Sequence, residues 1–90
     1  MDYSRQTGDA TVYDSYCLFW GVVINTNGSA NGVLTVYDGN PGSIVFAMTC
    51  VGADYSYGAL FRKAILCETS LRIEFSGTGA NVIVYYQREY

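Results

Sequence analysis

The chain has 90 residues, of which 50% are hydrophobic, 16% are aromatic and only 14% are charged, and its formal net charge is −3. A chain of this length forms one small domain at most, which buries only about 60–65% of its unfolded surface. Five scattered basic residues and a negative net charge argue against nucleic-acid binding, which needs a clustered basic face. Few charges and nine tyrosines predict exposed apolar area, a mark of interaction surfaces.

The first ten residues, MDYSRQTGDA, are polar and show no periodicity. We expect residues 1–10 to form a flexible arm that contacts a partner through Tyr3 and Arg5, and residues 11–90 to form a single folded domain. The opening lacks the basic start and apolar run of a signal peptide. The longest apolar stretch, residues 17–24, is shorter than the roughly 20 residues of a membrane span. We therefore expect a protein that is made in the cytoplasm and binds no membrane.

Short segments rich in β-branched and aromatic residues recur through the rest of the chain, bounded by turns rich in Gly, Asn and Asp. These segments predict strands at residues 11–13, 16–24, 33–37, 44–51, 59–67, 71–75 and 81–87. Gly21 predicts a bulge or a close backbone approach. The segment ALFRKAILC is compatible with a short helix or with a strand kinked at Arg62-Lys63, and the regular spacing of turns favours the strand.

Two loops stand out between these strands. Residues 25–32, NTNGSANG, contain two Asn-Gly pairs, which suit turns that need positive φ. Residues 52–58, GADYSYG, carry Tyr55 and Tyr57, and tyrosines in loops are typical of adaptable binding surfaces. These two rings are candidate contacts for a ligand or a receptor, or they cap the end of the fold.

The segment LRIEFSGTGANVIVYYQ near the C-terminus is the most informative. Apolar and charged residues alternate over residues 71–75, as in a strand with one wet face, and residues 77–79 predict a hairpin turn. The following strand is apolar on both faces, so its second face needs cover from another sheet or another chain. Tyr85 and Tyr86 are expected on opposite faces. We predict that this strand forms the interface of a homo-oligomer through Val82, Val84, Tyr85 and Tyr86.

Six or seven short strands without a convincing helix predict an all-β fold. The expected architecture is a small antiparallel β-sandwich with jelly-roll or immunoglobulin-like connectivity, or a small barrel. The predicted core residues are Trp20, Leu34, Val36, Phe46, Phe75 and Val84.

Three groups of residues suggest chemistry, and each has a simpler explanation. Glu68 and Glu74 could form a glycosidase-like acid/base pair, but Glu74 alternates with apolar residues and is expected on a solvated strand face. The glycines at residues 77–79 precede a strand, whereas phosphate loops precede a helix. Oxygens of residues 38–40 and Asp54 could hold calcium, although a plain turn explains the former. We therefore expect no enzymatic activity, no metal and no cofactor.

The three cysteines, Cys17, Cys50 and Cys67, are widely separated, and their neighbours are apolar. Free cysteine packs as a small buried hydrophobe. A nucleophilic cysteine needs a histidine partner, and the chain contains no histidine. These residues are expected to be reduced, partly buried thiols.

The strings GVLTVYDG (32–39) and SLRIEFSGTGANVIVYYQ (70–87) together resemble a group of small virion proteins of tailed bacteriophages. The likeness covers roughly residues 21–87, and Ser70 stands where glycine is usual in that group. The resemblance implies a β-sandwich structural protein of the phage particle, such as a capsid decoration (cement) protein or a head or tail accessory protein. It carries over no catalytic residues.

The function expected from these observations is that of a non-enzymatic virion protein, most simply a capsid decoration protein that stabilises the particle. It would be made in the host cytoplasm, reside in the virion as a homo-oligomer, with a trimer favoured, and bind the major capsid protein or another virion protein. The alternative is a receptor- or carbohydrate-binding module of a phage head or tail fibre, with Trp20, Tyr55 and Tyr57 as stacking rings.

Overall fold

The computed structural model of the protein describes residues 1–39 and 42–88. Within these residues the chain forms eight strands and one short 3-10 helix, η1 (Gly52–Asp54). The strands are β1 (Asp2–Gln6), β2 (Ala10–Tyr13), β3 (Cys17–Asn25), β4 (Gly32–Gly39), β5 (Gly42–Cys50), β6 (Ser56–Cys67), β7 (Leu71–Ser76) and β8 (Asn81–Arg88). Within the described residues, no helical segment has the length and hydrophobicity that a membrane span requires.

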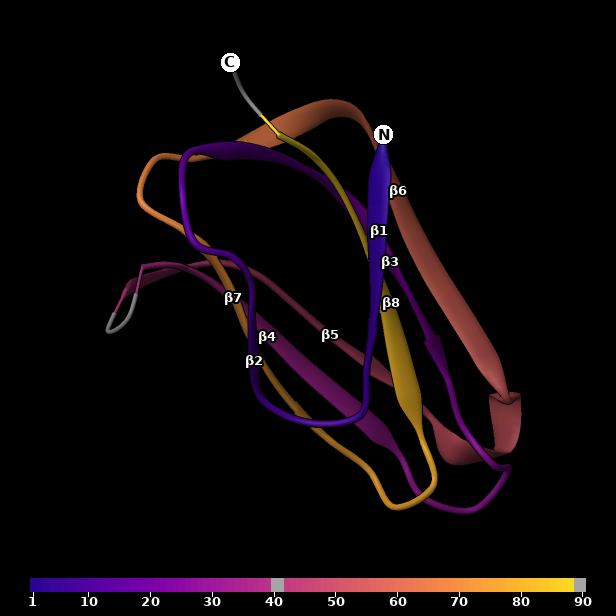
Figure 1. Ribbon diagram of the computed structural model, residues 1–90. Coiled ribbons are helices and arrows are strands. Elements are labelled where there is room, and N and C mark those ends of the chain that lie inside the picture. The colour runs from indigo at the N-terminus through magenta and orange to yellow at the C-terminus, as the bar shows by residue number, and fades with distance from the viewer. Residues whose placement is uncertain (40–41, 89–90) are drawn as a thin grey trace.

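The strands form two antiparallel four-stranded sheets that pack face to face (Figure 1). The strand order is β1-β8-β3-β6 in the first sheet and β2-β7-β4-β5 in the second. Consecutive strands lie in opposite sheets, except β4 and β5, which pair with each other. The pairs β4–β5, β3–β6, β2–β7 and β1–β8 are those of one long hairpin folded into two layers. This is the connectivity of an eight-stranded jelly roll. The predicted all-β sandwich is confirmed.

The core lies between the two sheets and follows the period-2 alternation of the strands. In β7, Leu71, Ile73 and Phe75 are buried while Arg72 and Glu74 point outward. The complete set of buried apolar residues is Cys17, Phe19, Val22, Ile24, Leu34, Val36, Cys50, Cys67, Leu71, Ile73, Phe75, Ala80, Val82 and Val84. Burial is confirmed for the predicted core residues Leu34, Val36, Phe75 and Val84.

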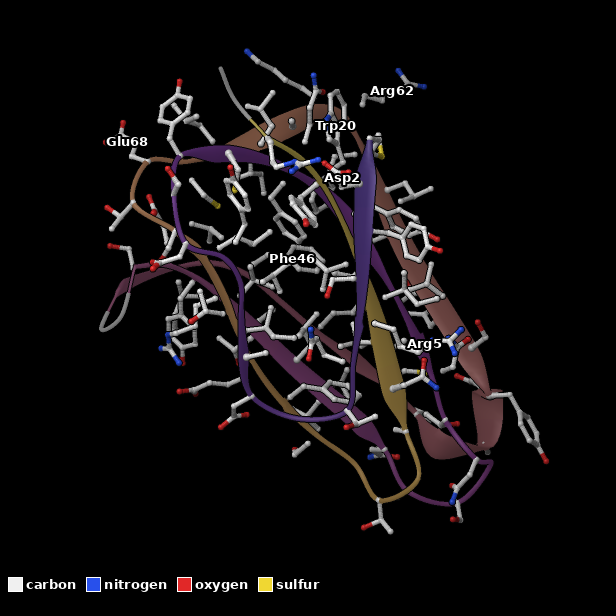
Figure 2. All side chains as sticks on the ribbon, in the orientation of Figure 1. Asp2, Arg5, Trp20, Phe46, Arg62 and Glu68 are labelled. Atoms are coloured by element: carbon white, nitrogen blue, oxygen red, sulfur yellow. The ribbon has the colours of Figure 1, made fainter. Side chains whose placement is uncertain are left out.

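Three phenylalanines join the two sheets at one end of this core. Phe46 of β5 lies between the sheets (Figure 2) and contacts Phe19 of β3 and Phe61 of β6. The ring centroids are 5.2–6.0 Å apart, and all three pairs are edge-to-face, the arrangement that aromatic quadrupoles prefer. Phe46 thus packs against the core as predicted.

A bulge at Gly21 shapes the first sheet. Phe19 and Gly21 are two residues apart in β3, but their partners in β8 are adjacent residues. Their partners in β6, Ile65 and Leu60, are five residues apart. Gly21 has φ of 146°, and a Cβ there would lie 2.8 Å from the Cα of Leu60. Only glycine fits so close a backbone approach. The predicted bulge is confirmed, and the segment at residues 59–67 is a strand with an irregular register rather than a helix.

Trp20, which the sequence places in the core, lies at this bulge on the outward side of the first sheet. Its indole Nε1 donates a hydrogen bond to Oε1 of Gln87, at 3.3 Å. The core prediction fails here because the extra residue in β3 reverses the alternation on either side of it.

The turn at residues 77–79 is present, since the backbone N–H of Ala80 donates to the carbonyl of Gly77 at 3.0 Å. It does not close a hairpin, because β7 and β8 belong to different sheets. The turn instead carries the chain from one layer to the other.

The prediction of a flexible arm over residues 1–10 is wrong. β1 pairs with β8 along its whole length, from Asp2 opposite Tyr86 to Gln6 opposite Val82. An ion pair of 3.1 Å joins Asp2 Oδ2 to Arg88 Nε. The boundary at residue 11 fails as well, because β2 already begins at Ala10. The residues of this segment are mostly polar because β1 is an edge strand, and its side chains stay partly exposed on both faces.

Candidate functional site

The outward side of the first sheet, which the second sheet does not cover, carries many apolar side chains. Residues directly opposite each other in an antiparallel pair point to the same face, so the register defines this surface. We call it the apolar face. The outward residues that the register places there, together with Trp20 at the bulge, are Tyr3, Arg5, Leu18, Trp20, Val23, Asn25, Ser56, Gly58, Leu60, Leu66, Asn81, Ile83, Tyr85 and Gln87. Arg5 is the only charged residue among them; Arg62 and Lys63 of β6 are exposed, but they lie between Leu60 and Ile65, where the register gives no pairs.

Several of these side chains are largely exposed. Tyr3 keeps 71% of its surface and Leu60 keeps 68%, and Leu66 is exposed as well. Trp20 lies toward one end of this sheet, and Arg5 lies farther along it (Figure 2). An apolar surface of this kind on a small domain marks an interaction site, since water contacts it at a cost in free energy.

The structure brings together two of the predicted contact regions. Tyr3 lies opposite Tyr85 in the β1–β8 register, and their ring centroids are 6.4 Å apart. Arg5 lies next along β1, opposite Ile83. Tyr3, Arg5 and Tyr85, predicted for two separate contacts, therefore share one surface.

The other residues predicted for the oligomer interface lie inside the molecule. Val82 and Val84 are 0% exposed and pack between the sheets, so they cannot contact another subunit. Tyr86 also points inward, where its ring lies 5.7 Å from that of Tyr13. This correction has a simple cause, because the second sheet covers one face of β8. The prediction that Tyr85 and Tyr86 lie on opposite faces agrees with the register.

Tyr55 and Tyr57 lie at one end of the sandwich, both more than half exposed. The expected loop over residues 52–58 is shorter than predicted, because η1 occupies its start and β6 begins at Ser56. Tyr57 is opposite Ile24, whose side chain points inward, whereas Trp20 points outward. The structure therefore does not gather the three rings into one stacking platform.

The backbone around Tyr55 is held tightly. Tyr55 has φ of 64°, the only positive φ of a non-glycine residue in the described chain. The backbone N–H of Thr26 donates a hydrogen bond to the carbonyl of Tyr55 at 2.6 Å. The Thr26 hydroxyl donates to the carbonyl of Gly52, also at 2.6 Å. The ring of Tyr55 lies against Gly28, where a Cβ would approach it within 2.8 Å. This end of the fold presents its tyrosine from a fixed backbone.

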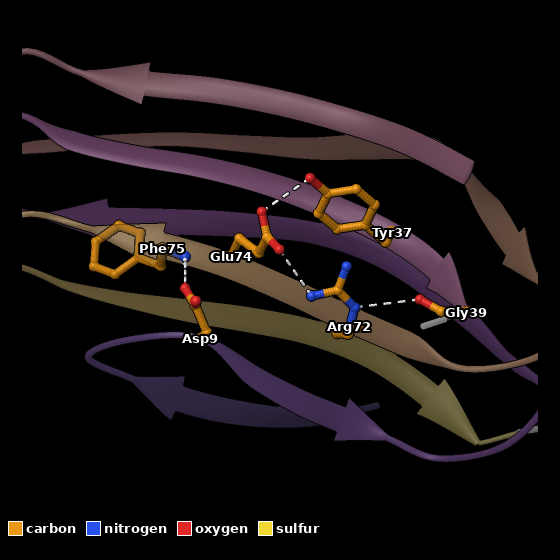
Figure 3. Close-up of polar contacts among 6 residues, drawn as sticks. All are labelled: Asp9, Tyr37, Gly39, Arg72, Glu74 and Phe75. Carbon is orange, nitrogen blue, oxygen red and sulfur yellow. Dashed lines mark hydrogen bonds and ion pairs between the residues drawn. The ribbon is translucent and has the colours of Figure 1, made fainter. Parts of the chain in front are cut away.

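The outward side of the second sheet has a different character. Arg72 donates to Glu74 Oε2 at 3.1 Å and to the carbonyl of Gly39 at 3.3 Å, and it stacks 4.3 Å from the ring centroid of Tyr37 (Figure 3). The Tyr37 hydroxyl donates to Glu74 Oε1 at 3.0 Å. We call this surface the polar face; its outward residues are Thr11, Val33, Thr35, Tyr37, Ile44, Ala47, Thr49, Arg72, Glu74 and Ser76.

The pKa values in this network follow its hydrogen bonds. Arg72 first, and then the Tyr37 hydroxyl, lower the pKa of Glu74. The same hydrogen bond to Glu74 is the main reason that the pKa of Tyr37 is raised. A shallow cavity of about 280 Å³ lies beside Glu74, and Asp9 at its edge accepts a hydrogen bond from the backbone N–H of Phe75 at 2.9 Å. The groups of the network thus satisfy one another within the chain.

The residues considered for chemistry are not gathered into one site. Glu68 lies in the turn before β7, and Glu74 lies near the far end of that strand, in the network just described. Asp38 and Asp54 lie near opposite ends of β4, and Asn40 falls outside the described residues. No group of three or more His, Cys, Asp or Glu residues is placed to hold a metal ion within residues 1–39 and 42–88.

Asp38 has a structural role instead. Its carboxylate accepts hydrogen bonds from the backbone N–H groups of Glu68, Thr69 and Ser70, at 2.9, 2.8 and 3.3 Å. Burial opposes the charged form, but these three donors outweigh it and lower the pKa of Asp38. Asp38 thereby fixes the turn that carries the chain from the first sheet to the second.

All three cysteines are free and buried, in agreement with their predicted packing. Cys17 and Cys67 lie directly opposite each other in the β3–β6 pair. No local pattern predicts this contact, because fifty positions of chain separate the two residues.

Comparison with models of protein families, with curated proteins and with solved structures gives no match to this chain. The function must therefore be inferred from the two outer faces of the sandwich and from the tyrosines at its end.

Proposed function

We propose that the chain is a non-enzymatic structural protein that assembles through its apolar face, and that its setting is the virion of a tailed bacteriophage, as a capsid decoration protein. The observation that carries the assembly role is the apolar face itself, on which the register places a single charged residue, Arg5. The virion setting is supported by the resemblance of residues 32–39 and 70–87 to small virion proteins. Jelly rolls recur in viral capsid domains, which adds an analogy at the level of the fold only.

The occupant proposed for the apolar face is a second copy of the same chain. Arg5 is the only charge that the register places on this face, so a partner of the same composition buries little unpaired charge there, and the exposed rings and leucines supply the contact area. A small domain with few charges gains stability when this surface is covered. Multiple copies bound to the capsid then stabilise the particle by mass action, since each copy binds the assembled shell and not the separated subunits.

The first experiment measures mass by light scattering after size exclusion, across a dilution series. We expect an oligomer that dissociates on dilution. Leu60→Asp places a charge on the apolar face and should lower the apparent association constant at least tenfold, since an uncompensated buried charge costs more than about 1.4 kcal/mol.

The matched control is Ile44→Asp, which introduces the same charge on an edge strand of the polar face. Ile44 is 63% exposed, close to the 68% of Leu60. This variant should associate like the unmodified chain. A monomer at every concentration, or equal effects of the two variants, would overturn the assembly proposal.

The virion setting needs a separate measurement. Purified particles of the phage that encodes the chain should contain it in many copies, detectable by mass spectrometry, and Leu60→Asp should reduce its occupancy on them. If the chain is absent from the particles although it self-associates in solution, the assembly role stands and the virion role falls.

A second candidate function is carbohydrate or receptor binding at the end of the sandwich. The observation that favours it is Tyr55, exposed and held at a positive φ by the contacts around Thr26, because such backbone strain concentrates at functional sites. Tyr57→Ala should abolish binding on a glycan array, while Leu60→Asp should not. An array without signal would retire this candidate.

A further inference from the structure

Two of the three buried thiols face each other across a strand pair. Cys17 is the first residue of β3, Cys67 is the last residue of β6, and each is 0% exposed. They are direct partners in the antiparallel register. Cys50 lies apart from them, at the end of β5 in the second sheet, opposite Gly32.

We propose that Cys17 and Cys67 form a disulfide when the protein is oxidised, and that this bond fixes the edge strand β6 to β3. The Cα atoms of directly opposed residues in antiparallel strands lie about 4.5–5.5 Å apart, depending on the hydrogen-bonding of the pair. A disulfide spans Cα separations of about 4.4–6.8 Å. The bond therefore forms with little movement of the backbone.

The reaction is a thiol–disulfide exchange with a small-molecule disulfide, for which we take oxidised glutathione. The thiolate of one cysteine attacks a glutathione sulfur, which forms a mixed disulfide and expels one glutathione thiolate. The second cysteine thiolate attacks the protein sulfur of that mixed disulfide and expels the second glutathione. The two cysteine thiols lose their protons to solvent or to the departing thiolates. The cysteine pair is oxidised by two electrons, and one glutathione disulfide is reduced to two thiols.

The thiolate is the reactive form, and the burial of both cysteines opposes it. Either cysteine can make the first attack once its thiol reaches solvent.

Both thiols become accessible when the strand ends open. Cys17 follows the exposed residues 14–16, and Cys67 precedes the exposed residues 68–69. Strand ends beside exposed turns open locally at a small free-energy cost compared with global unfolding. Oxidation is therefore expected over minutes to hours rather than at once.

The bond would act on the least supported part of the apolar face. β6 is an edge strand that pairs only with β3, its register is irregular beyond Leu60, and it carries Leu60 and Leu66. A link between residues 17 and 67 also closes a long segment of the chain and restricts the unfolded state. The oxidised protein should unfold at a higher urea concentration than the reduced protein.

Intact mass spectrometry of the full chain, after incubation with oxidised glutathione, tests the proposal. We expect a product lighter by two hydrogen atoms that reverts on reduction. A protease that cleaves before aspartate cuts at Asp14, Asp38 and Asp54, so each cysteine falls in a different peptide. The crosslink should join the peptide of Cys17 to that of Cys67.

Cys50→Ala is the matched control and should oxidise like the unmodified chain, with the same rise in its urea midpoint. Cys17→Ala should neither lose mass nor gain stability on oxidation. The peptide map on the unmodified chain needs no variant, so a misfolded variant does not affect the outcome. A crosslink that contains Cys50, or no crosslink under conditions that fully oxidise a reference dithiol peptide, would overturn the proposal.

Discussion

The two outer faces of the sandwich are built on sheets of the same size, yet they satisfy their side chains in opposite ways. On the polar face, Arg72, Glu74 and Tyr37 bind one another, and the guanidinium also reaches the carbonyl of Gly39. On the apolar face, Tyr3 and Leu60 remain largely exposed. The polar network is complete within one chain, although Val33 and Ile44 of the same face stay exposed. The apolar face leaves apolar surface that only another molecule can cover.

The difference separates folding from assembly. Contacts of the polar face exist in the isolated chain, so changes there should alter the stability of the monomer and leave association unchanged. Changes on the exposed side chains of the apolar face should alter association and leave the monomer nearly as stable, because surface substitutions usually change stability by no more than about 0.5 kcal/mol.

Loss of the bulge that shapes the apolar face should destabilise the protein most. Gly21→Ala places a Cβ against the backbone of Ala59 and Leu60, at a φ of 146° that alanine adopts poorly. We expect unfolding free energy to fall by about 3 kcal/mol or more, from backbone strain and the lost β3–β6 pairing. Urea denaturation measures it. Gly8→Ala, where a Cβ would meet nothing within 4 Å, is the control, and an equal loss in both variants would contradict the close-approach argument.

A smaller loss is expected where the chain crosses from the first sheet to the second. Asp38→Asn removes the charge that accepts three backbone hydrogen bonds from residues 68–70. We expect a loss of about 2 kcal/mol at neutral pH, typical of hydrogen bonds to a charged group. Asp54→Asn makes the same substitution at an exposed position and should have little effect.

The stability that Asp38 contributes should depend on pH, and it should decrease as the pH falls. The folded pKa of Asp38 lies below its unfolded value, so its contribution is present above that unfolded value, about 3.9, and is lost as the pH falls through the folded pKa. The stability difference between the unmodified chain and Asp38→Asn should therefore be largest above about pH 5 and shrink on acidification. A difference that stays constant to pH 2 would show that the hydrogen bonds do not depend on the charge.

The fluorescence of the single tryptophan, Trp20, reports on the apolar face alone. Trp20 lies on that face, partly exposed, and no other tryptophan contributes to the emission. If a second copy covers the face, dilution into the monomer should shift the emission to longer wavelength and increase quenching by acrylamide. The Leu60→Asp variant should show the shifted spectrum at all concentrations. An emission that is independent of concentration, while the mass changes, would place the association surface elsewhere.

Much of the fold could be predicted from the sequence, because strands and turns are encoded locally. The alternation in residues 71–75, the first Asn-Gly pair, whose Gly28 has φ of 90°, and Gly21 each predicted the correct local structure. The second pair did not, because Gly32 begins β4 without a positive φ. The polar β1 could not be predicted, since an edge strand shows little alternation. The burial of Val82 and Val84 depends on which sheet covers β8. The contact between Cys17 and Cys67 depends on the jelly-roll connectivity, which pairs β3 with β6. Both are long-range facts that no local pattern carries.

The smallest expected effect tests whether the polar face is self-contained. Glu74→Gln removes the ion pair with Arg72 while its amide oxygen can still accept from Tyr37. Because the Glu74 side chain is 47% exposed, solvent screens the pair, and we expect only a small fall in the urea midpoint. Since the folded pKa of Glu74 is lowered, this fall should be present above its unfolded pKa and vanish as the pH drops through the folded value.

Glu68→Gln, which changes the same charge outside the ion pairs of the described chain, is the control. The association constant should stay unchanged in both variants, because the polar face has no part in the contact between copies. A weaker association in Glu74→Gln alone would mean that the network serves an interface, and the division between a folding face and an assembly face would fail.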